Sequence, residues 1–256
     1  MKDILIFALR EAGKIQLHNF AKVHQVQQKE SLSSIVTEVD ILCDKIIVDA
    51  IRQKFPLHNI ISEESGFASN GSIYTWVIDP LDGTSNFAAG MPWFGVLIAL
   101  FENNIPKMAG AYLPIEDKLF FAEKGSGAFV NNKKLKIAEA ELKNSLFAFS
   151  IDYTDDQAFL ERGLTLYRFL IRNSRNIRST NSLVDYLMVA ENKLGGAINM
   201  FSKIWDIAAP WLIIKEAGGN MKPLDGEALE FEIDEKSLSR NYPVIAGSNS
   251  ILKSFQ

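Results

Sequence analysis

Apolar residues recur at helical spacing near the start of the chain. From residue 3 to about 28 they fall three or four positions apart, which predicts a helix with buried positions at Leu5, Ala8, Leu9, Ala12, Ile15 and Phe20. A second amphipathic helix is predicted from about 37 to 54, with Thr37 as its N-cap and the Phe55-Pro56 pair as its end. The chain therefore opens with two helices, and the apolar face of each must pack on another element.

The rest of the chain is divided between short apolar runs typical of strands and further helical patterns. Strands are predicted at 60–61, 74–78, 94–101, 107–113 and 118–122, with a hairpin at 128–137 that turns at Asn131-Asn132. Beyond about 145, strands at 145–150, 176–178, 196–200 and 243–247 alternate with helices. Those helices are predicted at 155–172 after a Thr154 cap, at 182–191, at 207–217 before Gly218-Gly219, and at the C-terminus.

This pattern predicts an α+β half over residues 1–140 and an α/β half over residues 141–256, joined in one compact catalytic unit. A length of 256 residues, with 47% hydrophobic and 23% charged residues, is typical of a globular protein of this size. The net charge of −4 makes nucleic acid an improbable main partner, because phosphate backbones attract clusters of Lys and Arg.

Cysteine usage and hydropathy indicate a cytoplasmic protein. A single cysteine, Cys43, excludes an intramolecular disulfide and fits a reducing compartment. No run of about 18 uncharged apolar residues is present, so no membrane-spanning helix is predicted. The N-terminus carries Asp3, Arg10 and Glu11 and lacks the long apolar region of a signal peptide.

The segment Asp79-Pro80-Leu81-Asp82 follows an apolar strand and carries two carboxylates three residues apart. Mg²⁺ takes oxygen ligands, and two carboxylates with a free carbonyl at Leu81 suit that need. The residues that follow, Gly83, Thr84 and Ser85, present successive backbone N–H groups at a helix start, which suits a phosphate. An ordinary Asx turn is the alternative, because Asp, Pro and Gly are common turn residues.

Two other acidic positions allow two interpretations each. Glu63-Glu64 come after the short strand at 60–61, as metal ligands or as solvated loop charges. Asp206 lies at a helix start, which we expect because Pro210 is best tolerated in a first turn. Asp206 is therefore a metal ligand or a simple N-cap.

Together these segments resemble the inositol monophosphatase superfamily. That family carries V-T-x-x-D, a glutamate pair after a strand, D-P-(I/L)-D-G-T, and W-D-x-A leading to E-A-G-G. The chain has these motifs in the same order within residues 29 to 219: Val36-Thr37 with Asp40, Glu63-Glu64, Asp79 to Thr84, Trp205-Asp206-Ile207-Ala208, and Glu216-Ala217-Gly218-Gly219. The resemblance implies a layered αβαβα sandwich, a homodimer, two or three Mg²⁺ ions, lithium sensitivity, and hydrolysis of a small metabolite's phosphate monoester by metal-activated water.

The resemblance also implies roles for single residues. The metal ligands would be Glu63, Asp79, the Leu81 carbonyl, Asp82 and Asp206. Glu64 would hold a metal-bound water, while Thr84 with Asp40 would orient and deprotonate the attacking water. Asp40 could instead only decorate the first turn of its helix, where the helix dipole favours a negative charge. Substrate contacts would come from Lys29, Gly83, Thr84, Ser85, Ser182 and Asn199.

Three positions depart from the family pattern. Ser34 stands where many members have aspartate, Asn181 replaces a glycine before Ser182, and Asn199 replaces a glutamate that binds inositol hydroxyls. We therefore expect an enzyme that is not a strict inositol monophosphatase, with a neutral Asn199 that favours more anionic substrates. Fructose 1,6-bisphosphate, 3′-phosphoadenosine phosphate, histidinol phosphate and NADP are the alternatives found elsewhere in the superfamily.

Two other function classes share features with this sequence. The haloacid dehalogenase type carries D-x-D-G-T and forms a phospho-aspartate, but the residue two before Asp82 is Pro80, so that nucleophile is missing. A regulatory role through binding of macromolecules occurs in some superfamily members. The full carboxylate set favours catalysis here and leaves a second, regulatory role open.

Overall fold

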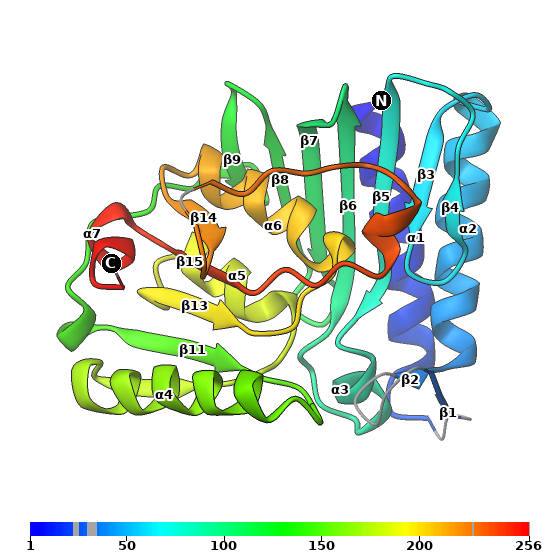
Figure 1. The fold of residues 1–256 in the computed structure, drawn as a ribbon. Helices are drawn as coiled ribbons and strands as arrows, with labels where there is room; N and C mark the ends of the chain where they lie inside the picture. Colours follow the sequence, from blue (N-terminus) through cyan, green and yellow to red (C-terminus); the bar gives the residue numbers. More distant parts are fainter. Residues whose placement is uncertain (23–25, 30–34, 227, 256) are drawn as a thin grey trace.

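The computed structural model describes residues 1–22, 26–29, 35–226 and 228–255. Two sheets alternate with three layers of helices (Figure 1): α1 and α2 cover the outer face of the larger sheet, α5 and α6 lie between the sheets, and α4 and α7 cover the smaller sheet. The predicted αβαβα sandwich is confirmed. The division of the chain into halves at residue 140 stays a prediction.

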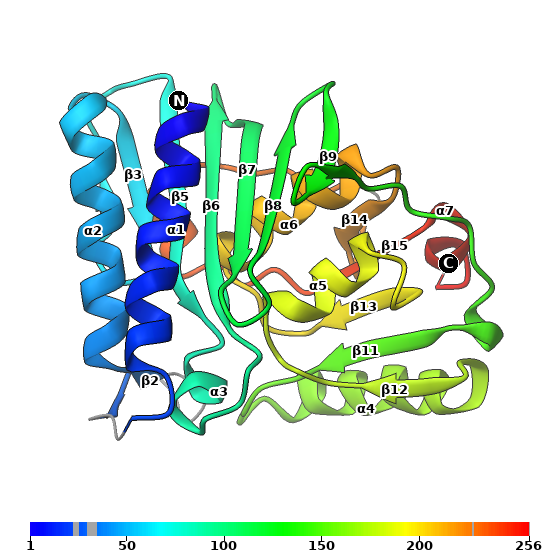
Figure 2. The ribbon, with the colours of Figure 1, turned by 180° about the vertical axis from the view of Figure 1, so that it is seen from behind.

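Helices α1 (Lys2–Asn19) and α2 (Glu38–Lys54) lie side by side on the larger sheet, which Figure 2 shows from behind. The predicted continuation of the first helix to residue 28 is wrong. Phe20 is extended, with φ −58° and ψ 142°, and Ala21 takes a left-handed φ of 60°, so the helix ends at Asn19. Two short strands follow and pair antiparallel: β1 (Gln27–Gln28) and β2 (Ile35–Val36).

The start of α2 is capped by Thr37, as predicted. Thr37 Oγ1 accepts the backbone N–H of Val39 at 3.2 Å, and Asp40 Oδ2 accepts the backbone N–H of Thr37 at 2.9 Å. Such a reciprocal capping box satisfies donors that the helix itself leaves unpaired. It therefore fixes the Asp40 carboxylate at the first turn of α2.

The larger sheet has eight strands in the order β10-β9-β8-β7-β6-β5-β3-β4, and β3 runs parallel to β5 while all other neighbours are antiparallel. Every strand predicted for this region is present, and Asn131 and Asn132 form the hairpin turn with φ of 45° and 66°. The bounds are β3 (Asn59–Ser62), β4 (Gly66–Ala68), β5 (Tyr74–Asp82), β6 (Gly95–Glu102), β7 (Ile105–Leu113), β8 (Lys118–Glu123), β9 (Gly127–Val130) and β10 (Lys133–Lys134). Strand β4 was not predicted, because three residues are too few to show an alternating pattern.

Strand β6 explains why the larger sheet can be covered on both faces. Its residues from Val96 to Phe101 are all buried apolar side chains, and successive side chains point to opposite faces. Val96, Ile98 and Leu100 belong to the core under α1 and α2, whereas Leu97, Ala99 and Phe101 belong to the core shared with α5 and α6. A continuous apolar run is what a strand buried on both faces requires.

The smaller sheet has the order β12-β11-β13-β15-β14. Strand β11 runs parallel to β12 and β13, and β15 is antiparallel to β13 and β14. Its strands are β11 (Leu146–Ser150), β12 (Asn176–Arg178), β13 (Gly196–Asn199), β14 (Asn220–Pro223) and β15 (Val244–Gly247). The remaining helices are α3 (Thr84–Ala88), α4 (Gln157–Asn173), α5 (Leu183–Ala190), α6 (Ile204–Glu216) and α7 (Asn249–Lys253), with short 3₁₀ turns at Leu142–Asn144 and Glu235–Leu238.

Two predictions about helix starts are wrong. The cap of α4 is Asp156, whose carboxylate accepts the N–H of Phe159, because Thr154 lies two residues too early and accepts from the N–H of Asp156 instead. Helix α6 begins at Ile204, so Pro210 lies in its second turn and does not mark the start. Proline there removes one helical hydrogen bond, a cost that the burial of α6 between two sheets offsets.

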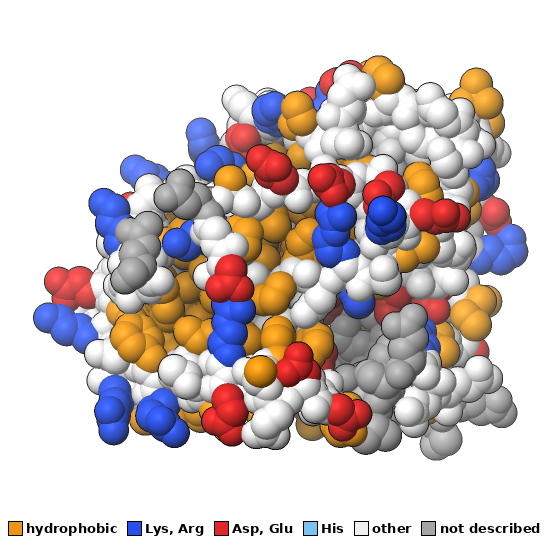
Figure 3. Space-filling view, in the orientation of Figure 1, with side chains coloured by type: hydrophobic (Ala, Val, Ile, Leu, Met, Phe, Trp, Pro, Cys, Tyr) orange, Lys and Arg blue, Asp and Glu red, His pale blue; other side chains and the backbone are white. Residues whose placement is uncertain are grey.

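The surface carries charges of both signs. Figure 3 shows Lys and Arg side chains interspersed with Asp and Glu over one face, without a field of a single sign. None of the helices in the described ranges combines the length and apolar character needed to cross a membrane.

Candidate active site

A pocket of about 490 Å³ lies between the two sheets and gathers most of the predicted site residues. It is lined from β5, from the starts of α3, α5 and α6, and from the ends of β11 and β13. Of the residues singled out from sequence, the lining includes Lys29, Glu63, Asp79, Leu81, Asp82, Gly83, Thr84, Ser85, Ser182, Asn199 and Asp206. Asp40 and Glu64 lie behind this lining, and Ser34 falls outside the described residues.

Strand β5 continues through the predicted loop and carries both aspartates. Asp79 pairs with Leu97 and Asp82 with Gly95, so three steps on β5 match two on β6 and the strand bulges. The buried amide of Gln16, from α1, donates to the carbonyls of Pro80 at 2.9 Å and Gly95 at 3.2 Å and clasps this bulge. The bulge turns both carboxylates toward the pocket, where an unbroken strand would send residues three apart to opposite faces.

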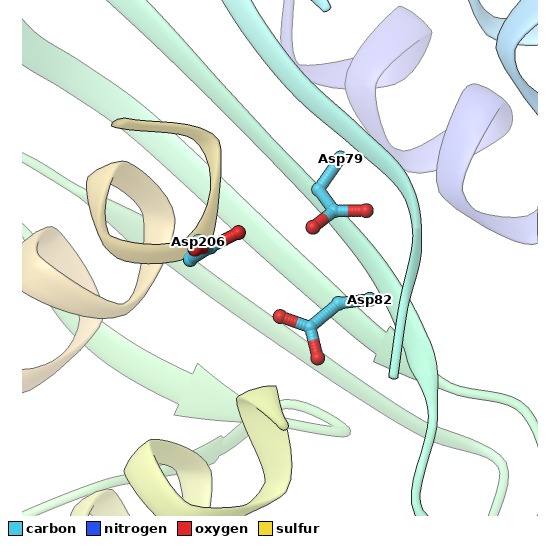
Figure 4. A group of neighbouring side chains, drawn as sticks. All are labelled: Asp79, Asp82 and Asp206. Atoms are coloured by element: carbon cyan, nitrogen blue, oxygen red, sulfur yellow. The ribbon is translucent and has the colours of Figure 1, made fainter. Parts of the chain in front are cut away.

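The three aspartates converge on one point (Figure 4). Asp79 and Asp82 reach it from β5 and Asp206 from the first turn of α6, with one carboxylate oxygen of each within 4.8 Å of the others. Backbone amides hold all three in place. Leu81 N–H donates to Asp79 Oδ1 at 3.1 Å, and Leu183 N–H donates to Asp82 Oδ1 and Lys203 N–H to Asp206 Oδ2, both at 2.6 Å. Asp82 and Asp206 each keep a second carboxylate oxygen that can bind an ion between the three aspartates.

Burial and mutual repulsion raise the pKa of every member of this aspartate cluster. The pKa of Asp82 rises to about 7, and those of Asp79 and Asp206 rise well above the ordinary aspartate value, first through burial and then through neighbouring carboxylates. A bound cation would stabilise the ionised carboxylates and so lower these pKa values again. The donors are oxygens only, without histidine or cysteine, which suits a hard ion such as Mg²⁺.

The glutamate pair flanks this cluster and is bound by Lys29. Lys29 Nζ donates to Glu63 Oε1 at 2.9 Å and to Glu64 Oε1 at 2.5 Å. Burial raises the pKa of Glu64 to about 7, against the opposing effect of Lys29. Burial alone would lower the pKa of Lys29, but the two glutamates outweigh it and raise that pKa.

Asp44, which sequence reasoning missed, supports the glutamate pair from behind. Its buried carboxylate accepts hydrogen bonds from the hydroxyl of Ser62 and, at 3.3 Å, from that of Ser65, the two residues that bracket the pair. Asp44 lies one helical turn after Asp40 and therefore on the same face of α2. That i, i+4 spacing was the available signal.

Thr84 and Asp40 are in contact, as the resemblance implied. Thr84 Oγ1 lies 2.8 Å from Asp40 Oδ1 and 2.9 Å from the carbonyl of Leu81, either of which can accept its proton. The other oxygen of Asp40 accepts from Thr37, so the carboxylate caps α2 and holds Thr84 at once. Burial raises the pKa of Asp40, although its hydrogen bonds to Thr37 and Thr84 act in the opposite direction.

Gly83 brings α3 close to the rest of the pocket. Its φ is +84°, and a Cβ there would lie 2.5 Å from the carbonyl oxygen of Trp93 and 3.2 Å from the Cβ of Ser182. Glycine is therefore required both by the left-handed backbone and by the lack of space. The predicted phosphate-facing residues Thr84 and Ser85 come directly after it, at the start of α3.

The outer wall of the pocket is formed by the ends of β11 and β13 and by the turn before α5. Asn199 lines it, with Oδ1 accepting the N–H of Phe201 at 2.9 Å. Asp152 lines it too and accepts from the side-chain amide of Asn181 at 2.7 Å. Asp152 was not singled out from the sequence, because no motif contains it and it follows an ordinary buried strand.

Comparison with known proteins gives a consistent result. The family model described as inositol monophosphatase family matches residues 1–254. A Haemophilus influenzae protein named Nus factor SuhB is 32% identical over 99% of this chain and 93% of its own length. Fructose-1,6-bisphosphatase/inositol-1-monophosphatase of Thermotoga maritima is 32% identical over 88% of this chain and 85% of its own.

Solved structures agree with this result. The extragenic suppressor protein suhB from Bartonella henselae superposes with a TM-score of 0.88 at 28% identity and covers 99% of this chain and 96% of its own. The family match over nearly the whole length, the relatives and the shared fold lead to one conclusion: this chain belongs to the inositol monophosphatase family.

Proposed function

We propose that this chain is a Mg²⁺-dependent phosphatase that hydrolyses the phosphate monoester of a small alcohol. The observation that carries the proposal is the convergence of Asp79, Asp82 and Asp206 beside the Thr84–Asp40 pair in one pocket. Phosphoryl transfer needs charge neutralisation and positioning of the attacking water more than covalent chemistry. In this pocket the aspartate cluster would hold the neutralising cation, and the Thr84–Asp40 pair would position the water.

The metal would be held by the aspartate cluster together with Glu63 and the carbonyl of Leu81, all of which line the pocket. When bound, Mg²⁺ polarises phosphate oxygens, acidifies water and stabilises the leaving alkoxide. The raised pKa values of the cluster support a cation there, because ionised carboxylates at this distance repel one another without one. Two or three ions are proposed, in keeping with the number of donors.

Thr84 and Asp40 would prepare the nucleophile. Thr84 Oγ1 donates to Asp40 Oδ1 and keeps lone pairs that accept a hydrogen bond from the attacking water. As the water oxygen bonds to phosphorus, the bond from phosphorus to the ester oxygen breaks, and the alcohol leaves as an alkoxide that takes a proton from solvent. The proton of the attacking water passes to Thr84 Oγ1 while the Thr84 proton passes to Asp40 Oδ1. A threonine hydroxyl is a poor base alone, and the buried Asp40, with its raised pKa, is a suitable acceptor.

The neighbouring residues would orient the water and the ester. Glu64, held by Lys29, would accept from a second water beside the carboxylates. Backbone N–H groups at Gly83, Thr84 and Ser85 would face the phosphate, because the first amides of α3 have no partner within the helix. Ser182 and Asn199 would contact the leaving alcohol.

Phosphate release from a panel of esters, with and without Mg²⁺, tests the proposal. We expect turnover that requires Mg²⁺ and is lost in excess chelator. Hydrolysis in ¹⁸O-labelled water under single turnover should place the label in phosphate, not in the protein. Full activity in chelator, or label in a protein side chain first, contradicts the mechanism.

A regulatory role is the second candidate, and the relative named Nus factor SuhB is the observation that favours it. The complete carboxylate set supports catalysis whether or not such a role exists. Pull-down with wild type and with Asp82→Asn separates the two functions. A partner retained by the inactive variant would establish binding independent of catalysis.

A further inference from the structure

Asp152 places a negative charge on the outer wall of the pocket, outside the aspartate cluster but near enough that its charge helps to raise the pKa of Asp206. It follows β11 by two residues, and the last residue of that strand, Ser150, is in register with Asn199 on β13. Asp152 and Asn199 both line the pocket, and Asn199 is one of the residues proposed above to contact the leaving alcohol. No family motif found in the sequence includes this carboxylate.

Asn181 orients this carboxylate. Asn181 Nδ2 donates to Asp152 Oδ1 at 2.7 Å, and the backbone N–H of Asn181 donates to the buried Asp185 at 3.2 Å. The backbone φ of Asn181 is 50°, a left-handed conformation that asparagine tolerates better than most residues. Within the described part of the chain no hydrogen bond reaches Asp152 Oδ2, which leaves that oxygen for a ligand.

Asn199 offers the pocket N–H donors, because its side-chain oxygen already accepts from the protein backbone. Asn199 Oδ1 accepts from the N–H of Phe201, so its Nδ2 is the group left for a substrate. The expectation that a neutral Asn199 favours anionic substrates considers that residue alone. Asp152 on the same wall supplies the negative charge that Asn199 lacks.

Among the described residues no ion pair joins Asp152 to a cation. Lys203 also lines the pocket, but its ammonium group donates to the carbonyl of Ser239 at 2.9 Å and not to Asp152. The nearest hydrogen-bonded partner of Asp152 is the neutral amide of Asn181. The wall therefore presents one anionic acceptor and one neutral donor to the leaving group.

Resting on the proposed function, we infer that Asp152 is a specificity-determining residue that selects monophosphate esters of hydroxyl-bearing alcohols and disfavours substrates with a second anionic group. A hydroxyl donates to its free oxygen in a charge-assisted hydrogen bond, about twice as strong as a neutral one. A second phosphate at this position meets like charge where water is partly excluded, which weakens its binding.

Three probes and three variants test this inference. Inositol 1-phosphate carries hydroxyl donors, fructose 1,6-bisphosphate carries a second anion, and p-nitrophenyl phosphate has neither. Asp152→Asn removes the charge, and Asn181→Gly removes the orienting amide while keeping a residue that accepts the left-handed backbone. Asp49→Asn, an exposed carboxylate on α2, is the matched control.

For Asp152→Asn we expect kcat/KM on inositol 1-phosphate to fall about tenfold relative to p-nitrophenyl phosphate, mainly through KM, with preference moving toward the bisphosphate. Asn181→Gly should shift selectivity in the same direction by a smaller factor. Asp49→Asn should leave all three ratios unchanged. An equal loss on all substrates in Asp152→Asn, or no change in selectivity, overturns the inference.

Binding separates this inference from the proposed function. Calorimetry with the non-hydrolysable phosphonate analogue of inositol 1-phosphate, in the presence of Mg²⁺, measures recognition without turnover. Weaker binding by Asp152→Asn supports the inference even if wild type hydrolyses nothing, a result that would reject only the proposed function. Equal binding by wild type and Asp152→Asn rejects the role of Asp152 whatever the activity.

Discussion

The two sides of the pocket are built in different ways. On the metal side, each aspartate of the cluster lies at a strand bulge or a helix start, and backbone amides of Leu183 and Lys203 fix Asp82 and Asp206. On the outer side, one side chain holds another, as Asn181 holds Asp152. Backbone contacts resist substitution, whereas contacts between side chains change with a single residue. The chemistry of this pocket is therefore rigidly specified while its selectivity is open to change.

The largest effect should follow from a change on the metal side. Replacing Asp82 with Asn keeps the shape of the side chain and removes one ionised ligand from the cluster. We expect kcat/KM to fall by at least about a hundredfold, the equivalent of a few kcal/mol of transition-state stabilisation. A Mg²⁺ titration of phosphate release measures it, with Asp49→Asn as the control. Activity near wild type in Asp82→Asn would remove Asp82 from the metal site.

The next effect concerns the nucleophile. Thr84→Ala should lower kcat by about 10² to 10⁴, the range for loss of general acid–base assistance, while the Mg²⁺ midpoint moves little. Thr84→Ser keeps the hydroxyl bonded to Asp40 and should recover most of the rate. If the serine variant is as slow as the alanine variant, the methyl group and not the hydroxyl explains the loss.

A smaller effect is expected behind the metal side. Asp44→Ala removes the acceptor that holds Ser62 and Ser65 on either side of the glutamate pair. Residues that orient metal ligands typically change affinity or activity about 10- to 100-fold, so the Mg²⁺ midpoint should rise within that range. Asp49→Ala on the exposed face of the same helix is the control. An unchanged midpoint in a folded Asp44→Ala protein would show that the pair needs no such support.

The smallest effect concerns the pH dependence of the metal-free protein. The folded pKa of Asp82 is raised to about 7, so between the ordinary aspartate value and about 7 the folded chain holds a proton that the unfolded chain has lost. Stability without metal should therefore fall as pH rises through this window. Thermal unfolding in chelator should give a lower Tm at pH 7.5 than at pH 5. The fall should be shallower in Asp82→Asn and absent with saturating Mg²⁺, and a Tm that rises with pH in chelator contradicts the cluster's repulsion.

The convergence of the carboxylates could be predicted from sequence because each proposed metal ligand sits in a short motif with its own local geometry. The Thr37 cap and the strand that delivers Asp79 are local features, and the resemblance joined them. The contact between Asp40 and Thr84, 44 positions apart, came from the resemblance alone. Asp152 and its contact with Asn181 depend on the packing of distant elements, for which no short-range pattern exists, whereas Asp44 shares an i, i+4 spacing with Asp40 on the same helix.

The two wrong helix boundaries have a common physical origin. Helix α1 ends at Asn19 although apolar residues continue, and α6 begins before Pro210 although proline favours a first turn. In both cases tertiary packing decided the boundary, and local propensity was the weaker influence. Helix and strand interiors were predicted well because their burial repeats over many residues.

The hydrogen bonds from Gln16 to the β5 bulge have a consequence for large-scale mutagenesis. Gln16 lies on a helix that contributes no residue to the pocket, yet its amide binds the carbonyl of Pro80 between two of the aspartates. In a library of variants scored by phosphate release, substitutions at Gln16 would group with those at the catalytic residues. Substitutions at its neighbours on α1 would lower the score only by lowering the amount of folded protein. Activity data of this kind would therefore mark Gln16 as functionally important, although its side chain contacts neither substrate nor metal.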